Sequence, residues 1–209
     1  MGDETAMWID ISKSLHEGME VFPGDSAFQY LKELDMDKGS AVNTGTIKMN
    51  THTGTHLDAP YHYDKYGRKI NELDINEVCG KAEVFDLTGA DAVTEDSIRD
   101  KNPVQTEIIL FRLKDKGTSF STYPPFTAEA VKMLADSGVR VIGVDTPSVD
   151  PASSEDLPAH RMCRTENMLI LEGLNLENIK EGTYELAAMP LNLFEADGSP
   201  VRAALRRWR

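Results

Sequence analysis

Three of the five histidines in this chain fall within one short run, His52-Thr-Gly-Thr-His56-Leu-Asp58-Ala-Pro-Tyr-His62. Neutral imidazole and carboxylate groups are the usual protein ligands of Zn²⁺ and related divalent ions. A lone histidine in such a segment is most often a surface residue or caps the core. Three histidines with an aspartate between them instead favour a metal site. The run therefore predicts a metal centre, although ligand chemistry alone does not specify the reaction.

The backbone must bend to bring these ligands to one ion. In an extended strand, His52 and His56 would be about 13 Å apart. The threonines, Gly54 and Pro60 make the segment a poor helix, so it does not match the helical His-Glu-x-x-His motif of zinc peptidases. Gly54 can adopt conformations that turn the chain, and Pro60 restricts its exit. We expect a loop-built ligand cluster at the end of a strand.

Short apolar runs predict the strands that position this cluster. They are rich in β-branched and aromatic residues and lie at 8–11, 82–87, 107–113, 139–144, 168–171 and 184–191. One helix is expected between an N-cap at Thr127 and a C-terminal Gly138, and a second near Thr94. The expected fold class is α/β, with a mixed β-sheet and few helices. The length fits a single domain spanning residues 1–209.

Composition excludes several classes of function. The formal net charge of −13 opposes binding to nucleic acid or to an anionic membrane surface. No apolar run reaches the roughly 18 residues that a membrane span needs, and residues 1–5 lack the pattern of a signal peptide. Cys79 and Cys163, the only cysteines, suggest no disulfide framework and are expected to be buried. A cytoplasmic protein is the expectation.

The histidine-rich run resembles the signature His-x-Gly-Thr-His-x-Asp-x-Pro-x-His of the cyclase-like metal-dependent hydrolase family. That family includes bacterial kynurenine formamidases (arylformamidases) and isatin hydrolases. Further blocks are similar to the formamidase branch and cover most of the chain, at 17–25, 143–151, 157–160, 168–174 and 189–206. The resemblance implies a cyclase-like fold of the swivelling β/β/α type. It also implies hydrolysis of N-formyl-L-kynurenine to L-kynurenine and formate, in tryptophan breakdown.

The resemblance further implies a site with two Zn²⁺ ions per subunit, for which Mn²⁺ is a possible substitute. The residues at matching positions would be metal ligands, a proton-transfer residue and an aromatic substrate contact, namely His52, His56, Asp58, His160 and Glu172 for metal, His62 for proton transfer, and Phe22 for substrate. Asp58 would bridge the two ions. Phe22 stands where relatives often have tryptophan, so the ring is kept and the indole N–H is lost.

On the residues alone, the more distant positions are weaker candidates. His160 follows a stretch rich in proline and serine, where a loop histidine is usually solvated, and Glu172 at a strand end more often faces solvent. Cys163 matches no family ligand and is interpreted as a bystander. Trp8 is expected to pack in the core, and Tyr30 is a further candidate for the wall of an aryl pocket.

The resemblance implies a homodimer. It also implies a small molecule as the substrate. Two alternatives remain open. One is a related hydrolase that acts on another aryl amide or lactam such as isatin. The other is a non-catalytic metal- or ligand-binding protein on the same fold, which His62 disfavours because such a protein needs no residue for proton transfer.

Overall fold

The computed structural model describes residues 7–99, 101, 106–115 and 118–208. Its strands are β1 (Ile9–Asp10), β2 (Gln29–Leu34), β3 (Thr44–Lys48), β4 (His56–Asp58), β5 (Cys79–Asp86), β6 (Ile108–Arg112), β7 (Val141–Val144), β8 (Leu169–Glu172), β9 (Gly182–Ala187), β10 (Gly198–Pro200) and β11 (Ala204–Arg207). The α-helices are α1 (Glu95–Arg99), α2 (Ala128–Asp136) and α3 (Pro158–Thr165). Short 3₁₀ helices are η2 (Met36–Lys38), η3 (Pro60–His62), η4 (Ile70–Glu72) and η5 (Ile75–Val78).

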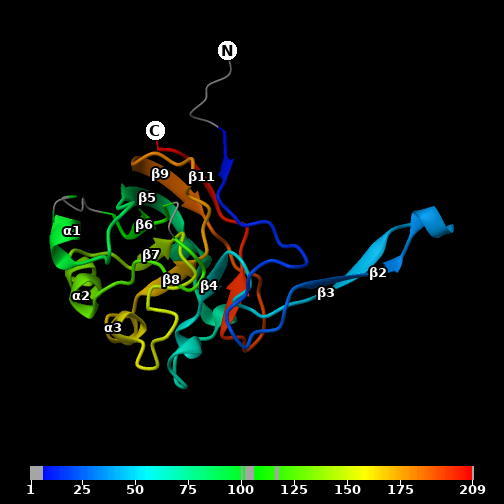
Figure 1. Ribbon diagram of the computed structural model, residues 1–209, viewed down its shortest axis with the longest axis horizontal. Coiled ribbons are helices and arrows are strands. Elements are labelled where there is room, and N and C mark those ends of the chain that lie inside the picture. Colours follow the sequence, from blue (N-terminus) through cyan, green and yellow to red (C-terminus); the bar gives the residue numbers. More distant parts are fainter. Residues whose placement is uncertain (1–6, 100, 102–105, 116–117, 209) are drawn as a thin grey trace, which may run out of the picture.

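One mixed sheet of nine strands organises the molecule, in the order β1-β11-β9-β5-β6-β7-β8-β4-β10. The central strands β5, β6, β7 and β8 run parallel to one another. Every pairing outside this central group is antiparallel. Helices α1, α2 and α3 lie together on one side of this sheet (Figure 1). The mixed sheet with few helices confirms the predicted fold class.

The central strands are buried on both faces. Val84 and Leu110 belong to one apolar cluster, while Phe85, Ile109 and Phe111 belong to the cluster beneath the helices. This division follows from the alternation of side chains along a strand. Burial on both faces explains why the sequence runs are almost continuously apolar. The result is a packed frame for the residues that project from β8 and β4, next to the β10 edge of the sheet.

The best-signalled helix forms where the sequence predicts it. Thr127 is the N-cap of α2, and its Oγ1 accepts a hydrogen bond from the backbone N–H of Ala130 at 3.1 Å. Gly138 follows the helix with a φ of +93°. Helix α2 connects the parallel strands β6 and β7, so the predicted helix lies between the strands expected at 107–113 and 139–144. The second helix, α1, begins directly after Thr94, also as predicted.

Several expectations outside the site were wrong. The Trp8 side chain is 44% exposed and stacks on the guanidinium group of Arg206 at 4.6 Å instead of packing in the core. Strand β9 ends at Ala187, short of the predicted residue 191. Cys163 is buried as expected, but Cys79 is only half-buried. Residues 1–5 lie outside the described residues. In the part of the chain that the structure describes, no helix is long and apolar enough to cross a bilayer.

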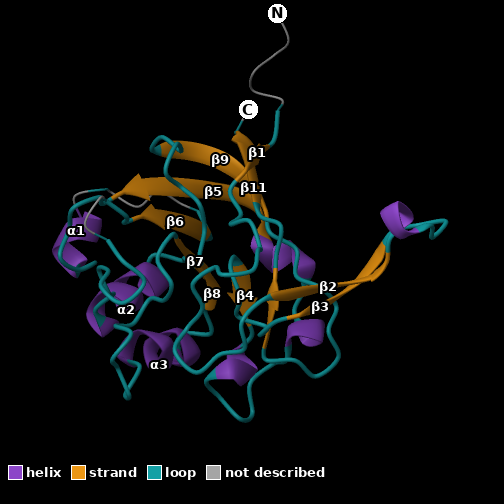
Figure 2. Ribbon diagram, turned by 45° about the vertical axis from the view of Figure 1, so that its right-hand side comes forward, coloured by secondary structure: helices purple, strands orange, loops and turns teal. Residues whose placement is uncertain are grey.

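A hairpin made of β2 and β3, hereafter the arm, was not predicted. The two strands form a separate antiparallel sheet that projects away from the body of the molecule (Figures 1 and 2). Every residue of both strands is exposed. Tyr30 pairs with Ile47 on the arm and is 49% exposed. The suggestion that Tyr30 walls an aryl pocket was therefore wrong.

Candidate metal centre

Strand β4 carries two of the predicted ligands, His56 and Asp58. They are two residues apart, so their side chains share one face of the strand, and His56 Nε2 lies 3.3 Å from Asp58 Oδ1. His52 comes from the preceding turn and places Nδ1 2.9 Å from the same oxygen. Gly54 has a φ of +75° in that turn. The predicted bend is present, but the cluster is built from a turn and a strand instead of a loop.

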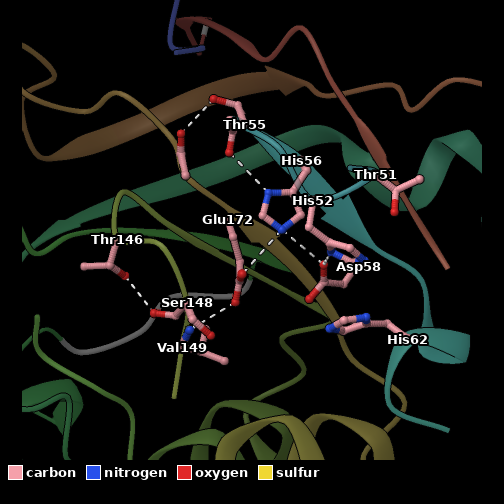
Figure 3. Close-up of polar contacts among 12 residues, drawn as sticks. Thr51, His52, Thr55, His56, Asp58, His62, Thr146, Ser148, Val149 and Glu172 are labelled. Carbon is pink, nitrogen blue, oxygen red and sulfur yellow. Dashed lines mark hydrogen bonds and ion pairs between the residues drawn. The ribbon is translucent and has the colours of Figure 1, made fainter. Parts of the chain in front are cut away.

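Glu172 reaches the cluster from the neighbouring strand. It is the last residue of β8 and is the cross-strand partner of His56 in the antiparallel β4–β8 pair. Its Oε2 lies 3.4 Å from His56 Nε2, and its Oε1 accepts a hydrogen bond from the Val149 N–H at 3.0 Å (Figure 3). The residue is only 4% exposed. Glu172 is thus a buried carboxylate at the cluster, although a strand-end glutamate more often faces solvent.

His160 lies in the first turn of α3, not in the solvated loop suggested by the sequence around it. The Asp150 carboxylate accepts hydrogen bonds from the backbone N–H groups of Ala159 and His160 at 2.9 and 3.0 Å, which satisfies the start of the helix. The same carboxylate is 2.7 Å from His160 Nδ1. Nε2 is left facing Asp58 Oδ2 at 3.6 Å and Glu172 Oε1 at 3.8 Å.

His62 borders the same cluster, and Asp197 links it to His52. The ring centroids of His62 and His52 are 4.0 Å apart, and His62 Nδ1 is 3.6 Å from Asp197 Oδ2. Asp197 also contacts His52 Nε2 at 3.0 Å and accepts a hydrogen bond from Thr51 Oγ1 at 2.9 Å. Figure 3 shows His52, Asp58 and His62 close together. Asp197 directly precedes β10, which pairs with β4.

Two carboxylates at this site, Asp150 and Asp197, were not predicted from the sequence. Asp197 adjoins the Gly198 block that resembles the formamidases, and Asp150 lies inside another such block. That proximity was an available signal. Their roles depend on contacts between residues far apart in the chain, because Asp197 meets His52 only through the β4–β10 pairing.

The electrostatics of the cluster favour positive charge at its centre. Burial disfavours the protonated forms of His56 and His160, but the adjacent carboxylates outweigh this and raise the pKa of each to about 10. Burial acts to raise the pKa of Asp58, yet the adjacent imidazoles of His160, His52 and His56 hold it well below its usual value. A cation bound among these groups would replace the protons that the histidines otherwise carry.

The donor atoms fit a divalent cation. Ligand atoms of His52, His56 and Asp58 lie within 4.8 Å of one another, and so do those of Asp58, His62 and His160. Asp58 Oδ2 is buried and accepts no hydrogen bond from any described residue, as expected for an oxygen reserved for a metal. Imidazole and carboxylate ligands suit zinc and manganese. These residues can therefore hold a metal centre.

A cavity of about 390 Å³ opens onto this cluster, a volume suited to a small molecule. Phe22 and Phe120 line it, and their ring centroids are 6.0 Å apart with the rings edge to face. Met19, Val21 and Leu157 add further apolar surface to the wall. The cavity therefore places an aromatic, largely apolar wall beside the candidate metal ligands.

The model of a protein family described as putative cyclase matches residues 9–151, a segment that contains the His52–His62 run. The chain belongs to this cyclase family. A kynurenine formamidase from Geobacillus thermodenitrificans is 43% identical over 203 residues, which cover 96% of this chain and 97% of the relative. The resemblance inferred from the sequence motifs is thereby confirmed.

Solved structures of similar proteins share the cyclase-family fold. A predicted metal-dependent hydrolase from Bacillus stearothermophilus has a TM-score of 0.80 and 28% identity, covering 95% of this chain and 97% of its own. Isatin hydrolase A from Labrenzia aggregata has a TM-score of 0.86 with 23% identity, covering 98% and 95% respectively. The second likeness shows the fold alone.

Gly173, directly after β8, lies close to the turn that contains His52 and Gly54, hereafter the histidine turn. Its φ is +68°, and a Cβ there would lie 2.2 Å from the carbonyl oxygen of Gly54. We expect Gly173→Ala to destabilise the protein by about 2–5 kcal/mol, because backbone strain and overpacking add. At Gly138, with φ +93° and nothing within 4 Å, alanine should cost only about 1–2 kcal/mol. Urea denaturation measures both variants, and equal losses would contradict the close contact.

Proposed function

We propose that this chain is a metal-dependent arylformamidase that hydrolyses N-formyl-L-kynurenine to L-kynurenine and formate. The observation that carries this proposal is the convergence of His52, His56, Asp58, His160 and Glu172 beside a cavity with an aromatic wall. The identity of 43% to a kynurenine formamidase, over nearly the full length of both chains, supports the substrate. We further propose that residues 1–209 form one catalytic domain.

The site is proposed to hold two divalent ions, with zinc as the metal and manganese as a substitute. The two oxygens of Asp58 face opposite halves of the cluster, since Oδ1 contacts His52 and His56 while Oδ2 faces His160. Glu172 divides in the same way, with Oε2 toward His56 and Oε1 toward His160. This division supports Asp58 as the bridging ligand.

The metal centre would supply Lewis acidity and lower the pKa of water towards 7. The chain's own residues orient the reaction around it. Hydrolysis adds water to the formyl carbon, breaks the C–N bond and leaves a proton on the departing aniline nitrogen. His62 is assigned the transfer of that proton, because its ring centroid lies 4.0 Å from that of His52 and its side chain, 34% exposed, lines the cavity. Phe22 and Phe120 would contact the aryl ring of the substrate.

A direct assay tests the assignment of substrate. The purified protein is incubated with N-formyl-L-kynurenine, and the absorbance of kynurenine is followed over time. Parallel reactions contain isatin, the lactam substrate of the alternative function. We expect kynurenine formation with a kcat/KM at least tenfold above that for isatin ring opening. Preferred hydrolysis of isatin, or no kynurenine, would overturn the formamidase assignment.

Asp197 is expected to tune the reaction without binding the substrate itself. It contacts His52 Nε2 at 3.0 Å and lies 3.6 Å from His62 Nδ1, so it can orient both imidazoles. Outer carboxylates of this kind typically contribute 10- to 100-fold to affinity or rate. We therefore expect Asp197→Asn to lower kcat by about 10- to 100-fold. Steady-state kinetics at saturating metal measure kcat, and a value within twofold of wild type would show that Asp197 does not orient the catalytic imidazoles.

The arm supports the proposal of a homodimer. A two-stranded hairpin alone is only marginally stable in water. Here the exposed side chains on the arm and its tip include Tyr30, Leu31, Leu34, Met36, Val42 and Ile47. Such a concentration of exposed apolar groups is typical of a protein interface, and a second copy of this chain is the proposed occupant.

The free cysteines are compatible with a reducing compartment and support a cytoplasmic location.

Sedimentation velocity tests the arm as the dimer contact. Ile47→Lys places a charge beside Tyr30 on the exposed surface of the arm, so it should convert the dimer to monomer. Asp96→Lys changes an exposed charge on α1, far along the chain from the arm, and should leave the dimer intact. A wild-type monomer, or a dimer that withstands Ile47→Lys, would contradict this interface.

A further inference from the structure

The cavity beside the metal centre is lined by acidic and apolar side chains and by a single lysine. Lys13 is the only lysine or arginine among the described residues of its lining, which also includes the carboxylates of Glu20, Asp25 and Asp197. A substrate carboxylate entering such a cavity would be repelled by these acids. Apart from the histidines of the metal site, Lys13 is therefore the side chain of this lining whose positive charge could offset that repulsion.

The ammonium group of Lys13 is held beside the site without a partner of its own. Its Nζ lies 3.4 Å from the position that a Cβ on Gly173 would occupy, directly after Glu172. Within the described part of the chain, no carboxylate lies within the 4.0 Å of an ion pair, and no hydrogen bond forms to Nζ. The donor capacity of Nζ is thus available to a molecule in the cavity.

The backbone at Lys13 is fixed against the metal motif. The Lys13 N–H donates a hydrogen bond to Thr55 Oγ1 at 2.8 Å, and that hydroxyl donates to the Gly173 carbonyl at 2.7 Å. Two residues earlier, the Ile11 carbonyl accepts a hydrogen bond from the Asn175 N–H at 2.8 Å. The base of the lysine side chain is therefore positioned by the segment that follows β8 and by the histidine turn, which lowers the cost of ordering it around a ligand.

The charge of Lys13 persists at neutral pH. Burial, with a further contribution from the charge of Lys114, lowers its pKa to about 8. The carboxylates of Asp145, Glu172 and Glu20 act in the opposite direction and favour the ammonium form. At pH 7 the side chain is thus mostly protonated and can attract an anion.

We propose that Lys13 is a specificity-determining residue that binds the carboxylate of an α-amino acid substrate while its aryl formamide group lies at the metal centre. This inference rests on the proposed function and deepens it. The ammonium group of the same substrate would meet the acidic side chains of Glu20 and Asp25 on the cavity wall. The zwitterion is thereby matched by charges of both signs, and a neutral aryl formamide gains nothing from Lys13.

Two substrates separate this role from an effect on the metal centre. N-formyl-L-kynurenine carries the amino acid group, whereas 2′-formamidoacetophenone has the same aryl formamide without it. We expect Lys13→Met to lower kcat/KM for N-formyl-L-kynurenine by about 10- to 100-fold, mainly through KM, since one charge-assisted hydrogen bond is lost. The kcat/KM of the same variant for 2′-formamidoacetophenone should stay within twofold of the wild-type value. Lys13→Arg should restore much of the selectivity for N-formyl-L-kynurenine over 2′-formamidoacetophenone.

A matched lysine provides the control. Lys114 is exposed in the neighbouring cavity that Lys13 also borders, so Lys114→Met should leave the selectivity unchanged. Loss of selectivity in that variant would place the carboxylate in the second cavity and overturn the proposal. Equal losses of both substrates in Lys13→Met, or no loss, would overturn it as well.

Binding of the product separates failure of this inference from failure of the proposed function. Calorimetry with the metal-loaded protein compares L-kynurenine with 2′-aminoacetophenone, and Lys13→Met should weaken binding of L-kynurenine alone by about 10- to 100-fold. If the wild-type protein neither binds L-kynurenine nor hydrolyses its formyl derivative, the proposed function is rejected. Wild-type activity on both formamides, with no discrimination lost in Lys13→Met, rejects only the role of Lys13.

Discussion

Replacing His62 with alanine is expected to leave bound metal unchanged and to lower kcat by about 10²- to 10⁴-fold, the usual contribution of a proton-transfer residue. The reason is its position at the edge of the ligand cluster. His62 follows β4 on η3, and its side chain is more exposed than those of His56 and His160. The measurements are steady-state kinetics with N-formyl-L-kynurenine and metal content by mass spectrometry.

The control for His62→Ala is His16→Ala. His16 is an exposed histidine outside the cavity lining, with its Nδ1 3.0 Å from the Glu17 carbonyl oxygen. This variant should retain both metal and activity. If His62→Ala loses metal, His62 is a ligand, an arrangement compatible with its grouping with Asp58 and His160. A near-normal rate would remove it from proton transfer altogether.

Asp58→Asn is expected to abolish metal binding and to lower kcat/KM by about 10³-fold or more. Asp58 is fully buried and contacts three histidines, so its negative charge is the centre of the cluster. The Lewis acidity and nucleophile activation lost with the metal are worth several kcal/mol, and each 1.36 kcal/mol corresponds to a tenfold change in rate. Metal content and steady-state kinetics measure the two losses together.

Thermal unfolding distinguishes this effect from simple misfolding. Binding of a ligand to the native state raises the melting temperature, so added zinc should stabilise wild type but not Asp58→Asn. Asp91→Asn, at an exposed position outside the site, should behave as wild type. A folded Asp58→Asn variant that still gains stability from zinc and turns over substrate would contradict the central role of Asp58.

The sequence predicts the elements whose signals are local. The apolar runs of β5, β6, β7 and β8 identify strands because burial on both faces requires continuous apolar residues. Helix α2 is predicted because its cap and its buried face both lie in one segment, from Thr127 to Gly138. The bend at Gly54 follows from the geometry that two histidine ligands impose.

The features that the sequence does not reveal depend on distant contacts. The α3 helix is unexpected because Pro158 and the preceding polar residues resemble a loop, whereas Asp150 satisfies the first N–H groups of the helix. Asp197 joins the site only through the pairing of β10 with β4. The arm lacks a buried face, so its strands do not show the alternation that identifies half-buried strands.

We propose that hydrolysis depends on metal held by the cluster of His52, His56, Asp58, His160 and Glu172. The most direct test removes metal with a chelator, then adds zinc in steps while bound metal per chain and kynurenine formation are measured on the same samples. We expect no turnover in the metal-free protein and activity that rises with bound zinc to a plateau at two ions per chain. Undiminished kynurenine formation by the metal-free protein would rule out a metal-dependent reaction.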